Sequence, residues 1–203
     1  MESEISASSG GRAVFLDRDG TIIEDVGYAS SLDQLAIYPE TIGALHELKE
    51  AGFRLIVVSN QSGVARGLID PSFPDEALRR LRETLTWNGA PLLDGGYHCP
   101  HHPEAEVEQF RRDCECRKPE PGMLLDAARD FDVDLSRSYV VGDHFSDVET
   151  AHRVGASGVL VLTGHGMHHV TKLDQVEPIA RPDFVATDIL EAARWIILHR
   201  QHR

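Results

Sequence analysis

Residues 13–21 read AVFLDRDGT, and this stretch decides the fold class. Its first half, Ala13–Leu16, is an apolar run typical of a strand that is buried on both faces. The run ends abruptly at the charged residues of DRDG, as expected where a buried strand meets a loop. Comparable apolar runs recur at Leu55–Val58, Tyr139–Val141, Val159–Leu162 and Phe184–Ala186.

Segments with the apolar spacing of helices separate these runs. They are Pro39–Ala51, Pro74–Trp87, Met123–Phe131, Ser146–Val154 and a last helix that begins near Asp188. Strands that alternate with helices favour crossover connections and a mostly parallel sheet with helices on both faces. We therefore expect an α/β, Rossmann-like, doubly wound fold, in which residues 12–203 form a single domain and residues 1–11 form a disordered tail.

Composition excludes several classes of function. The chain has 203 residues, with 20 Lys and Arg against 33 Asp and Glu, which gives a formal charge of −13. So acidic a surface repels a phosphate backbone or an anionic bilayer, and we expect neither nucleic-acid nor membrane partners. Residues 1–11 lack the basic start and apolar stretch of a signal peptide. We expect a cytoplasmic protein, and the absence of a heptad pattern or exposed apolar stripe gives no reason to expect more than a monomer.

Strong polar residues follow the ends of the predicted strands. They are Asp17 and Asp19, then Ser59 and Asn60, then Asp143 and Asp147, with Arg117 and Lys118 ahead of a helix. In such sheets, ligands bind beyond the carboxyl ends of the strands. The carboxylates of Asp17, Asp19 and Asp143 would repel one another without a cation, and oxygen ligands favour Mg²⁺. This arrangement suits phosphoryl transfer, with one carboxylate as nucleophile and its neighbour as acid and base.

Each of these motifs also has a simpler interpretation. DRDG can be an ordinary turn, and Asp143 or Asp147 can cap the following helix. Four strand ends that carry such groups in order favour the catalytic interpretation, in which Lys118 and Ser59 stabilise charge on the transferring phosphoryl group.

The motifs DRDGT, SNQ, RKP and GDHFSD resemble the four ordered motifs of the haloacid dehalogenase (HAD) superfamily of phosphohydrolases. This resemblance implies Asp17 as nucleophile, Asp19 as acid and base, and Ser59 and Lys118 as stabilisers of the phosphoryl group. It also implies that Mg²⁺ is held by Asp17, Asp143 and the backbone carbonyl of Asp19. Neither gap between the motifs clearly holds a large cap domain, so we expect a minimal cap.

All three cysteines lie in one segment of about residues 98–121, which is rich in Pro, charge and His. Cys99, His101, Cys114 and Cys116 form a C-x-H-x12-C-x-C pattern. Thiolate and imidazole ligands in a set of four favour a closed, structural zinc site. We predict that zinc pins this loop so that Arg117 and Lys118 face the phosphate. Two alternatives stay open, namely unliganded thiols beside a solvated histidine, or a Cys99–Cys114 disulfide.

The loop sequences narrow the resemblance. HCPHHP, CECRKPEPGM, VGY and NQSGVARG are similar to the D-glycero-D-manno-heptose-1,7-bisphosphate 7-phosphatases, over about residues 14–164. The resemblance implies substrate contacts from Asp25, Gly27, Tyr28, Asn60, Gln61, Ser62, Arg117 and His144. The heptose enzymes usually carry Lys where this chain has His144, a residue that is mostly neutral at pH 7. A second histidine cluster, His165 with His168 and His169, is expected to be a solvated loop.

Two alternatives to the heptose assignment remain. The sister family of histidinol-phosphate phosphatases shares both the catalytic set and the zinc loop. A zinc-stabilised interaction module without turnover is the other alternative, although such a module normally has a broken catalytic set, and here every member is present.

Overall fold

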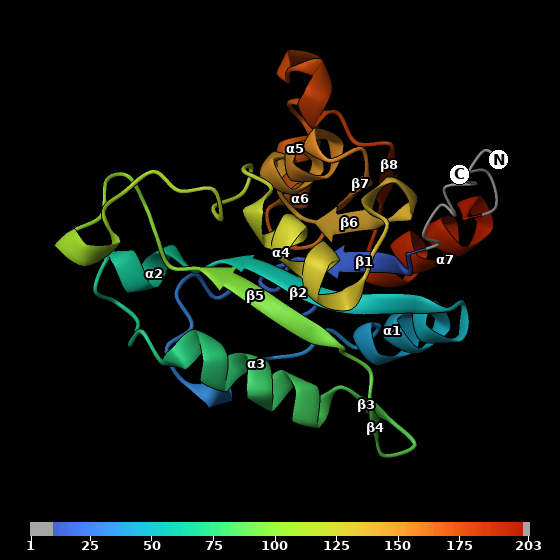
Figure 1. Ribbon diagram of the computed structural model, residues 1–203, viewed down its shortest axis with the longest axis horizontal. Helices are drawn as coiled ribbons and strands as arrows, with labels where there is room; N and C mark the ends of the chain where they lie inside the picture. The colour runs from blue at the N-terminus through green and yellow to red at the C-terminus, as the bar shows by residue number, and fades with distance from the viewer. Residues whose placement is uncertain (1–9, 201–203) are drawn as a thin grey trace, which may run out of the picture.

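A computed structural model of the protein describes residues 10–200, and its centre is a six-stranded sheet (Figure 1). The strands lie in the order β5 (Gly95–Cys99), β2 (Phe53–Asn60), β1 (Arg12–Leu16), β6 (Tyr139–Gly142), β7 (Ser157–Val161) and β8 (Phe184–Ala186). Every neighbouring pair in this sheet is parallel. The predicted α/β, doubly wound fold is confirmed.

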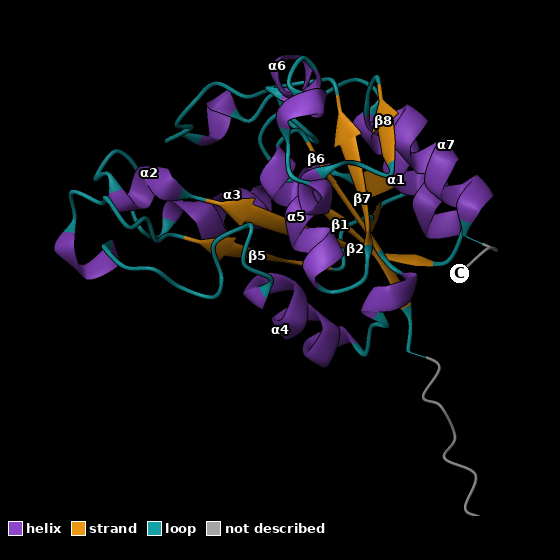
Figure 2. Ribbon diagram, turned by 90° about the horizontal axis from the view of Figure 1, so that it is seen from above, coloured by secondary structure: helices purple, strands orange, loops and turns teal. Residues whose placement is uncertain are grey.

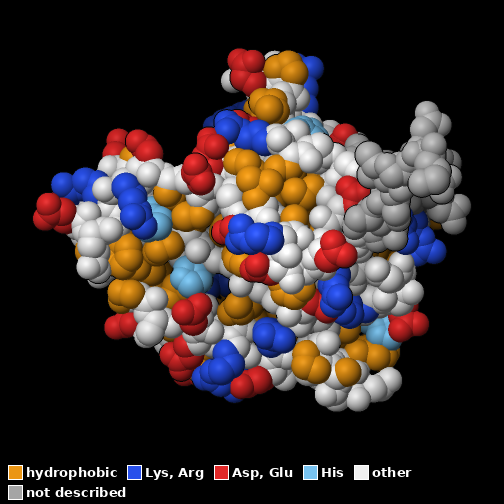
Figure 3. Space-filling view, viewed as in Figure 1, with side chains coloured by type: hydrophobic (Ala, Val, Ile, Leu, Met, Phe, Trp, Pro, Cys, Tyr) orange, Lys and Arg blue, Asp and Glu red, His pale blue; other side chains and the backbone are white. Residues whose placement is uncertain are grey.

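Helices cover both faces of the sheet (Figure 2). Packed on one face are α1 (Thr41–Glu50), α3 (Phe73–Thr84) and α7 (Ile189–His199). Packed on the other are α4 (Gly122–Phe131) and α5 (Phe145–Arg153). Acidic and basic side chains are interspersed over the face seen in Figure 3, so the negative charge is spread over this surface.

Strand β1 explains why both faces need a cover. Val14 and Leu16 pack with the helices of one face, while Ala13 and Phe15 pack with those of the other. None of these four side chains is exposed. Because successive side chains of a strand point to opposite faces, an uninterrupted apolar run must be buried on both sides.

The predicted helix Pro74–Trp87 corresponds to α3, but its predicted C-terminal boundary is wrong, because α3 ends at Thr84. Beyond it, β3 (Thr86–Trp87) and β4 (Ala90–Pro91) form a small antiparallel hairpin. The two residues between them, Asn88 and Gly89, have φ angles of 50° and 80°. Asn-Gly is the pair that favours a two-residue hairpin turn, and this signal could have corrected the helix boundary.

The edge strand β5 was also missed, and the loop predicted from residue 98 begins after Cys99. The sequence of β5, GGYHC, has neither a β-branched run nor alternation. Its two glycines are needed for packing, since a Cβ at Gly95 would lie 2.6 Å from the Phe131 ring and one at Gly96 would lie 2.7 Å from Leu78. The glycines of this strand therefore reflect the close approach of α3 and α4, and no local sequence pattern predicts the strand.

The segment 17–40, which connects β1 to α1, contains one short 3-10 turn and isolated bridges such as Ile23 with Ile37, as expected for a minimal cap. Residues 1–9 of the predicted tail lie outside the described residues. Gly11, however, donates to the Asp132 carbonyl at 2.7 Å and accepts from Asp134 N–H at 2.8 Å. Gly11 thus belongs to the folded domain, which begins before the predicted boundary at residue 12. No helix in residues 10–200 is long and apolar enough to cross a membrane.

Candidate active site

A cavity of about 610 Å³ opens where β1 and β2 end. The predicted catalytic and substrate-contact residues all line it, namely Asp17, Asp19, Asp25, Gly27, Tyr28, Ser59, Asn60, Gln61, Ser62, Arg117, Lys118 and His144. Asp143, the other predicted Mg²⁺ ligand, is fully buried and hydrogen-bonds His144. The strand ends thus bring together residues from across the chain, as the parallel topology requires.

Lys118 is a buried cation that lines this cavity. Its Nζ lies 2.7 Å from Asp17 Oδ1 and 2.5 Å from Asp147 Oδ1, and it donates to the Val58 carbonyl at 2.8 Å. Burial opposes the charge of Lys118, but the carboxylates of Asp147 and Asp17 outweigh it and raise its pKa. The ammonium is therefore held charged at the position where a phosphoryl group would meet Asp17.

Asp17 is surrounded by more negative charge than Lys118 offsets. Burial raises the pKa of Asp17 to about 7, although Lys118 lowers it. The nearby carboxylates of Asp147 and Asp143 contribute to this rise. Metal-free Asp17 is therefore a carboxylate whose ionised form needs another cation.

Asp143 is held from two sides. Its Oδ1 lies 2.7 Å from His144 Nδ1, and its Oδ2 accepts from the His165 backbone N–H at 2.7 Å. Burial alone would raise the pKa of Asp143, but these hydrogen bonds and the His144 charge lower it. Gly20 and Gly164, with φ of 77° and 53°, lie so close that a Cβ on either would overlap Asp143 Oδ2.

The Cys and His residues of the predicted zinc site do converge. The ligand atoms of Cys99, His101, Cys114 and Cys116 all lie within 4.8 Å of one another. Cys99 Sγ is 2.8 Å from Cys116 Sγ, and His101 Nδ1 is 3.4 Å from Cys116 Sγ. The hydrogen bond between Cys116 and Cys99 is the main cause that lowers the pKa of Cys116, to about 5, which favours the thiolate that metals bind.

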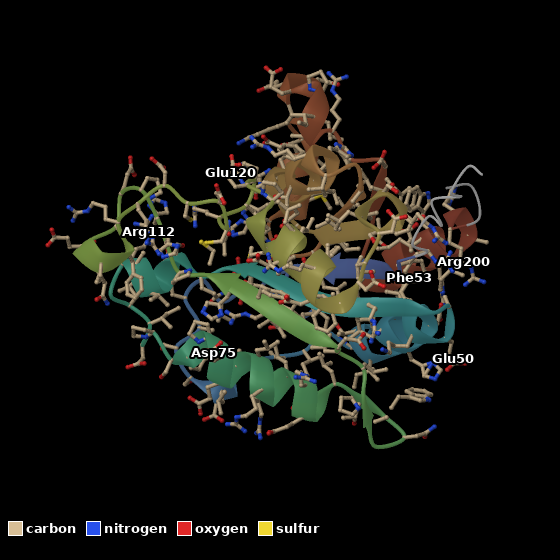
Figure 4. The ribbon with its side chains drawn as sticks, in the orientation of Figure 1. Glu50, Phe53, Asp75, Arg112, Glu120 and Arg200 are labelled. Atoms are coloured by element: carbon tan, nitrogen blue, oxygen red, sulfur yellow. The ribbon has the colours of Figure 1, made fainter. Side chains whose placement is uncertain are left out.

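These four residues can hold a metal ion, and their donor set fits zinc. All three cysteines are free, so the Cys99–Cys114 disulfide that the sequence left open is not formed. In Figure 4, Arg112 lies on the outer part of this loop, and Glu120 lies where the loop reaches α4. The cluster sits between these points, directly ahead of Arg117 and Lys118.

Comparisons with known proteins decide the family. Residues 115–192 match the profile of the HAD-hydrolase-like family. The D-glycero-beta-D-manno-heptose-1,7-bisphosphate 7-phosphatase of Escherichia coli K12 is 47% identical over 157 residues, which are 75% of this chain and 80% of that enzyme. The enzyme of the same name from Photorhabdus laumondii is 46% identical over 157 residues, 75% of this chain and 81% of its own. The chain belongs to this family of HAD-like phosphatases.

A solved structure agrees with this assignment. The D,D-heptose 1,7-bisphosphate phosphatase of B. bronchiseptica, crystallised with magnesium and phosphate, superposes with a TM-score of 0.78 at 30% identity. The match covers 93% of this chain and 99% of that one. The expected HAD resemblance is confirmed, and the protein is a phosphatase.

The donors around the cavity of this phosphatase also fit magnesium. The acidic groups are Asp17, Asp19, Asp143 and Asp147, and the buried basic groups that contact them are Arg18 and Lys118. Oxygen donors with surplus negative charge are the environment that a hard divalent cation needs. Asp17 and Asp143 with the Asp19 carbonyl are the ligand set that the sequence resemblance implies, and the raised pKa of Asp17 is consistent with a missing positive charge.

Three charged or titratable residues of the phosphatase cavity had no predicted role in the site. Asp147 and Arg18 line it, and both contact the predicted catalytic residues directly. The sequence places Asp147 at a strand end, and its spacing four residues after Asp143 at the start of a helix could have indicated a role in the site. Arg18 could have been found as a charged residue at the end of a buried strand.

The third of these residues corrects an expectation in part. His165 is exposed, as expected of a solvated loop, but it also lines the cavity, and His168 and His169 lie in the short helix α6 (Gly166–Val170). His165 Nε2 lies 2.8 Å from Asp25 Oδ2. This contact joins the loop after β7 to the loop after β1, so the two loops form one wall of the cavity.

Proposed function

We propose that this phosphatase removes the 7-phosphate of D-glycero-β-D-manno-heptose 1,7-bisphosphate through an aspartyl-phosphate on Asp17. The observation that carries the proposal is a complete set of Asp17, Asp19, Ser59 and Lys118 around one cavity, in a chain 47% identical to a named heptose bisphosphate 7-phosphatase. The same completeness is the reason to set aside a non-catalytic interaction module.

In the first step, a carboxylate oxygen of Asp17 attacks the phosphorus atom. The bond from phosphorus to the sugar oxygen breaks, and Asp19 gives a proton to that oxygen as it leaves. Lys118 Nζ and the Ser59 hydroxyl stabilise the negative charge of the transferring phosphoryl group. The products of this step are the dephosphorylated sugar at C7 and a phosphorylated Asp17.

In the second step, Asp19 takes a proton from a water molecule as the water attacks phosphorus. The bond from phosphorus to the Asp17 oxygen breaks, which releases inorganic phosphate and restores the carboxylate. Magnesium, when bound by Asp17, Asp143 and the Asp19 carbonyl, neutralises phosphate charge and orients the phosphoryl group. The protein residues supply the nucleophile and every proton transfer.

We also propose that zinc occupies the cluster of Cys99, His101, Cys114 and Cys116 and has a structural role. Four protein ligands leave no position for a substrate or a catalytic water. The proximity of their ligand atoms and the lowered pKa of Cys116 support this proposal. Free thiols of this kind suit a reducing compartment, which is why we propose the cytoplasm as the site of action.

Phosphate release in the presence of Mg²⁺ tests the proposed substrate. Both anomers of the heptose bisphosphate are compared with histidinol phosphate. We expect kcat/KM for the β-anomer to exceed that for histidinol phosphate at least about tenfold, or about 1.4 kcal/mol in transition-state binding. A preference for histidinol phosphate would contradict the proposal and place the enzyme in the sister family.

A further inference from the structure

Arg18 lies between the two catalytic aspartates of DRDG, and its side chain is buried. Its Nε donates to Asp19 Oδ2 at 3.0 Å, and its Nη2 donates to Asp19 Oδ1 at 3.0 Å. The guanidinium thus meets both carboxylate oxygens at once, which fixes the plane of the carboxylate as well as its position. Nη2 donates in addition to Gln61 Oε1 at 3.0 Å.

Gln61 completes this arrangement from the end of β2. Its Nε2 donates to Asp19 Oδ2 at 3.1 Å and to the Ser59 hydroxyl oxygen at 2.7 Å. An amide has two N–H donors, and here both are used within the protein. Gln61 is only 3% exposed, so it offers no free N–H to a substrate, although the sequence resemblance implied a substrate contact.

We propose that Arg18 and Gln61 are positioning residues for the acid and base Asp19. Proton transfer requires the carboxylate within hydrogen-bond reach of the leaving oxygen, and a misplacement of about 1 Å can cost about a hundredfold in rate. Arg18 holds both oxygens of Asp19, and Gln61 ties one of them to Ser59. The inference rests on the proposed function, in which Asp19 protonates the leaving sugar oxygen.

A comparison of two leaving groups can show whether Arg18 and Gln61 act by positioning Asp19 or in another way. A sugar oxygen leaves slowly unless it is protonated, whereas 2,4-dinitrophenolate leaves readily without a proton. The value of kcat/KM reports only the steps up to the first departure, so the later attack of water does not enter it. A residue that acts through Asp19 should therefore matter for the sugar phosphate and little for 2,4-dinitrophenyl phosphate.

The experiment measures kcat and KM of the Mg²⁺-loaded enzyme on heptose 1,7-bisphosphate and on 2,4-dinitrophenyl phosphate. The variants are Arg18→Lys, which keeps the charge but not the two-pronged contact, and Gln61→Met, which keeps the volume but not the hydrogen bonds. Arg79→Lys is the matched control, because Arg79 is exposed on α3 and pairs with Glu83 on the same helix. Thermal unfolding of each variant checks that the fold is retained.

We expect both variants to lose at least about tenfold in kcat/KM for the sugar phosphate, with KM within about threefold of wild type, and to lose less than about threefold for the dinitrophenyl ester. Arg18→Lys combined with Asp19→Asn should cost no more than Asp19→Asn alone, because the effect passes through Asp19. Equal losses on both substrates, a rise in KM alone, or additive losses in the double variant would overturn the proposal.

The Asp19→Asn variant distinguishes a failure of the proposed function from a failure of the positioning role. If this variant loses as much on the dinitrophenyl ester as on the sugar phosphate, Asp19 is not the acid of the first step, and the proposed function fails at that point. If Asp19→Asn shows the expected selectivity while Arg18→Lys and Gln61→Met do not, the proposed function stands and the positioning role is wrong.

Discussion

The side-chain amide of Asn60 holds the backbone of Lys118. Asn60 Nδ2 donates to the Lys118 carbonyl at 3.1 Å, and Asn60 Oδ1 accepts from the Lys118 N–H at 3.0 Å. The end of β2 thereby holds the backbone of Lys118, just after the loop that carries Cys114 and Cys116. The ammonium of the same residue contacts Asp17. The position of Lys118 thus depends on Asn60 as well as on the cluster of Cys99, His101, Cys114 and Cys116.

Asn60→Ala should release Lys118 from β2 while the ammonium keeps its carboxylate partners. We expect a loss of about 1–3 kcal/mol in the free energy of unfolding, since one side chain makes two part-buried hydrogen bonds. We also expect kcat to fall more than KM rises, because a displaced Lys118 stabilises the transition state less well. Denaturant unfolding and steady-state kinetics measure both effects, and an unchanged kcat would mean that Asn60 does not position Lys118.

Gly20→Ala should damage the site through Asp143. Gly20 has φ of +77°, and a Cβ there would overlap Asp143 Oδ2, so the variant must shift a residue proposed to bind magnesium. We expect a loss of about 1–3 kcal/mol in stability from the strained backbone, and weaker activation by Mg²⁺. Titration of activity with Mg²⁺ gives the second effect.

Gly43→Ala is the matched control for this variant. Gly43 lies in α1, and a Cβ there would meet nothing within 4 Å. We expect a gain of about 0.5–1 kcal/mol in helix stability with Mg²⁺ activation unchanged. A Gly20→Ala enzyme with wild-type Mg²⁺ dependence would show that Asp143 does not need this close packing.

Loss of the proposed zinc from Cys99, His101, Cys114 and Cys116 should inactivate the enzyme indirectly. Cys116 is followed at once by Arg117 and Lys118, so a loosened loop displaces both. For Cys114→Ser we expect less than one equivalent of zinc per chain, a lower Tm and a large fall in kcat. Elemental analysis of the wild-type protein is the prior check, and protein with full activity but no zinc would contradict a structural role.

His144→Lys should change the pH dependence of KM. Burial lowers the pKa of His144, but Asp143 outweighs this and raises it, so the imidazolium persists to a higher pH than an ordinary histidine does. The charge is present below the ordinary pKa of 6.5 and is lost as the pH rises through the raised value. A lysine keeps its charge over this range.

The KM of the His144→Lys variant for the anionic substrate should therefore fall below that of wild type at pH 8, and the difference should narrow towards pH 6. Steady-state kinetics across this range gives the ratio. A ratio that does not change with pH would mean that the charge of residue 144 does not act on the substrate.

The sequence predicts the parts of this molecule whose signal is local. AVFL and LIVV are apolar runs that end at polar residues, so both the strands and the side chains at their ends that line the cavity could be predicted. The edge strand Gly95–Cys99 could not be predicted, because its glycines leave room for the helices that pack against them, and this packing exists only in the fold. The ligand spacing likewise predicted which Cys and His residues converge, and it favoured zinc while leaving unliganded thiols or a disulfide open.

No local sequence pattern predicts the contacts between side chains of the site. Arg18 and Asp19 are neighbours in the sequence, but Gln61, which contacts both, lies 43 positions after Arg18 and 42 after Asp19. Their hydrogen bonds follow from the packing of β1 beside β2, which is a property of the folded sheet. The pairing of His165 with Asp25 depends in the same way on two loops that meet only in the fold.

The central claim is that this phosphatase works through an aspartyl-phosphate on Asp17. Its most direct test is phosphate release from D-glycero-β-D-manno-heptose 1,7-bisphosphate with Mg²⁺, comparing wild type with Asp17→Asn. We predict measurable turnover by the wild type and a loss of at least about a thousandfold in the variant, about 4 kcal/mol, with Tm and zinc content retained. Turnover by Asp17→Asn within tenfold of wild type would contradict the account.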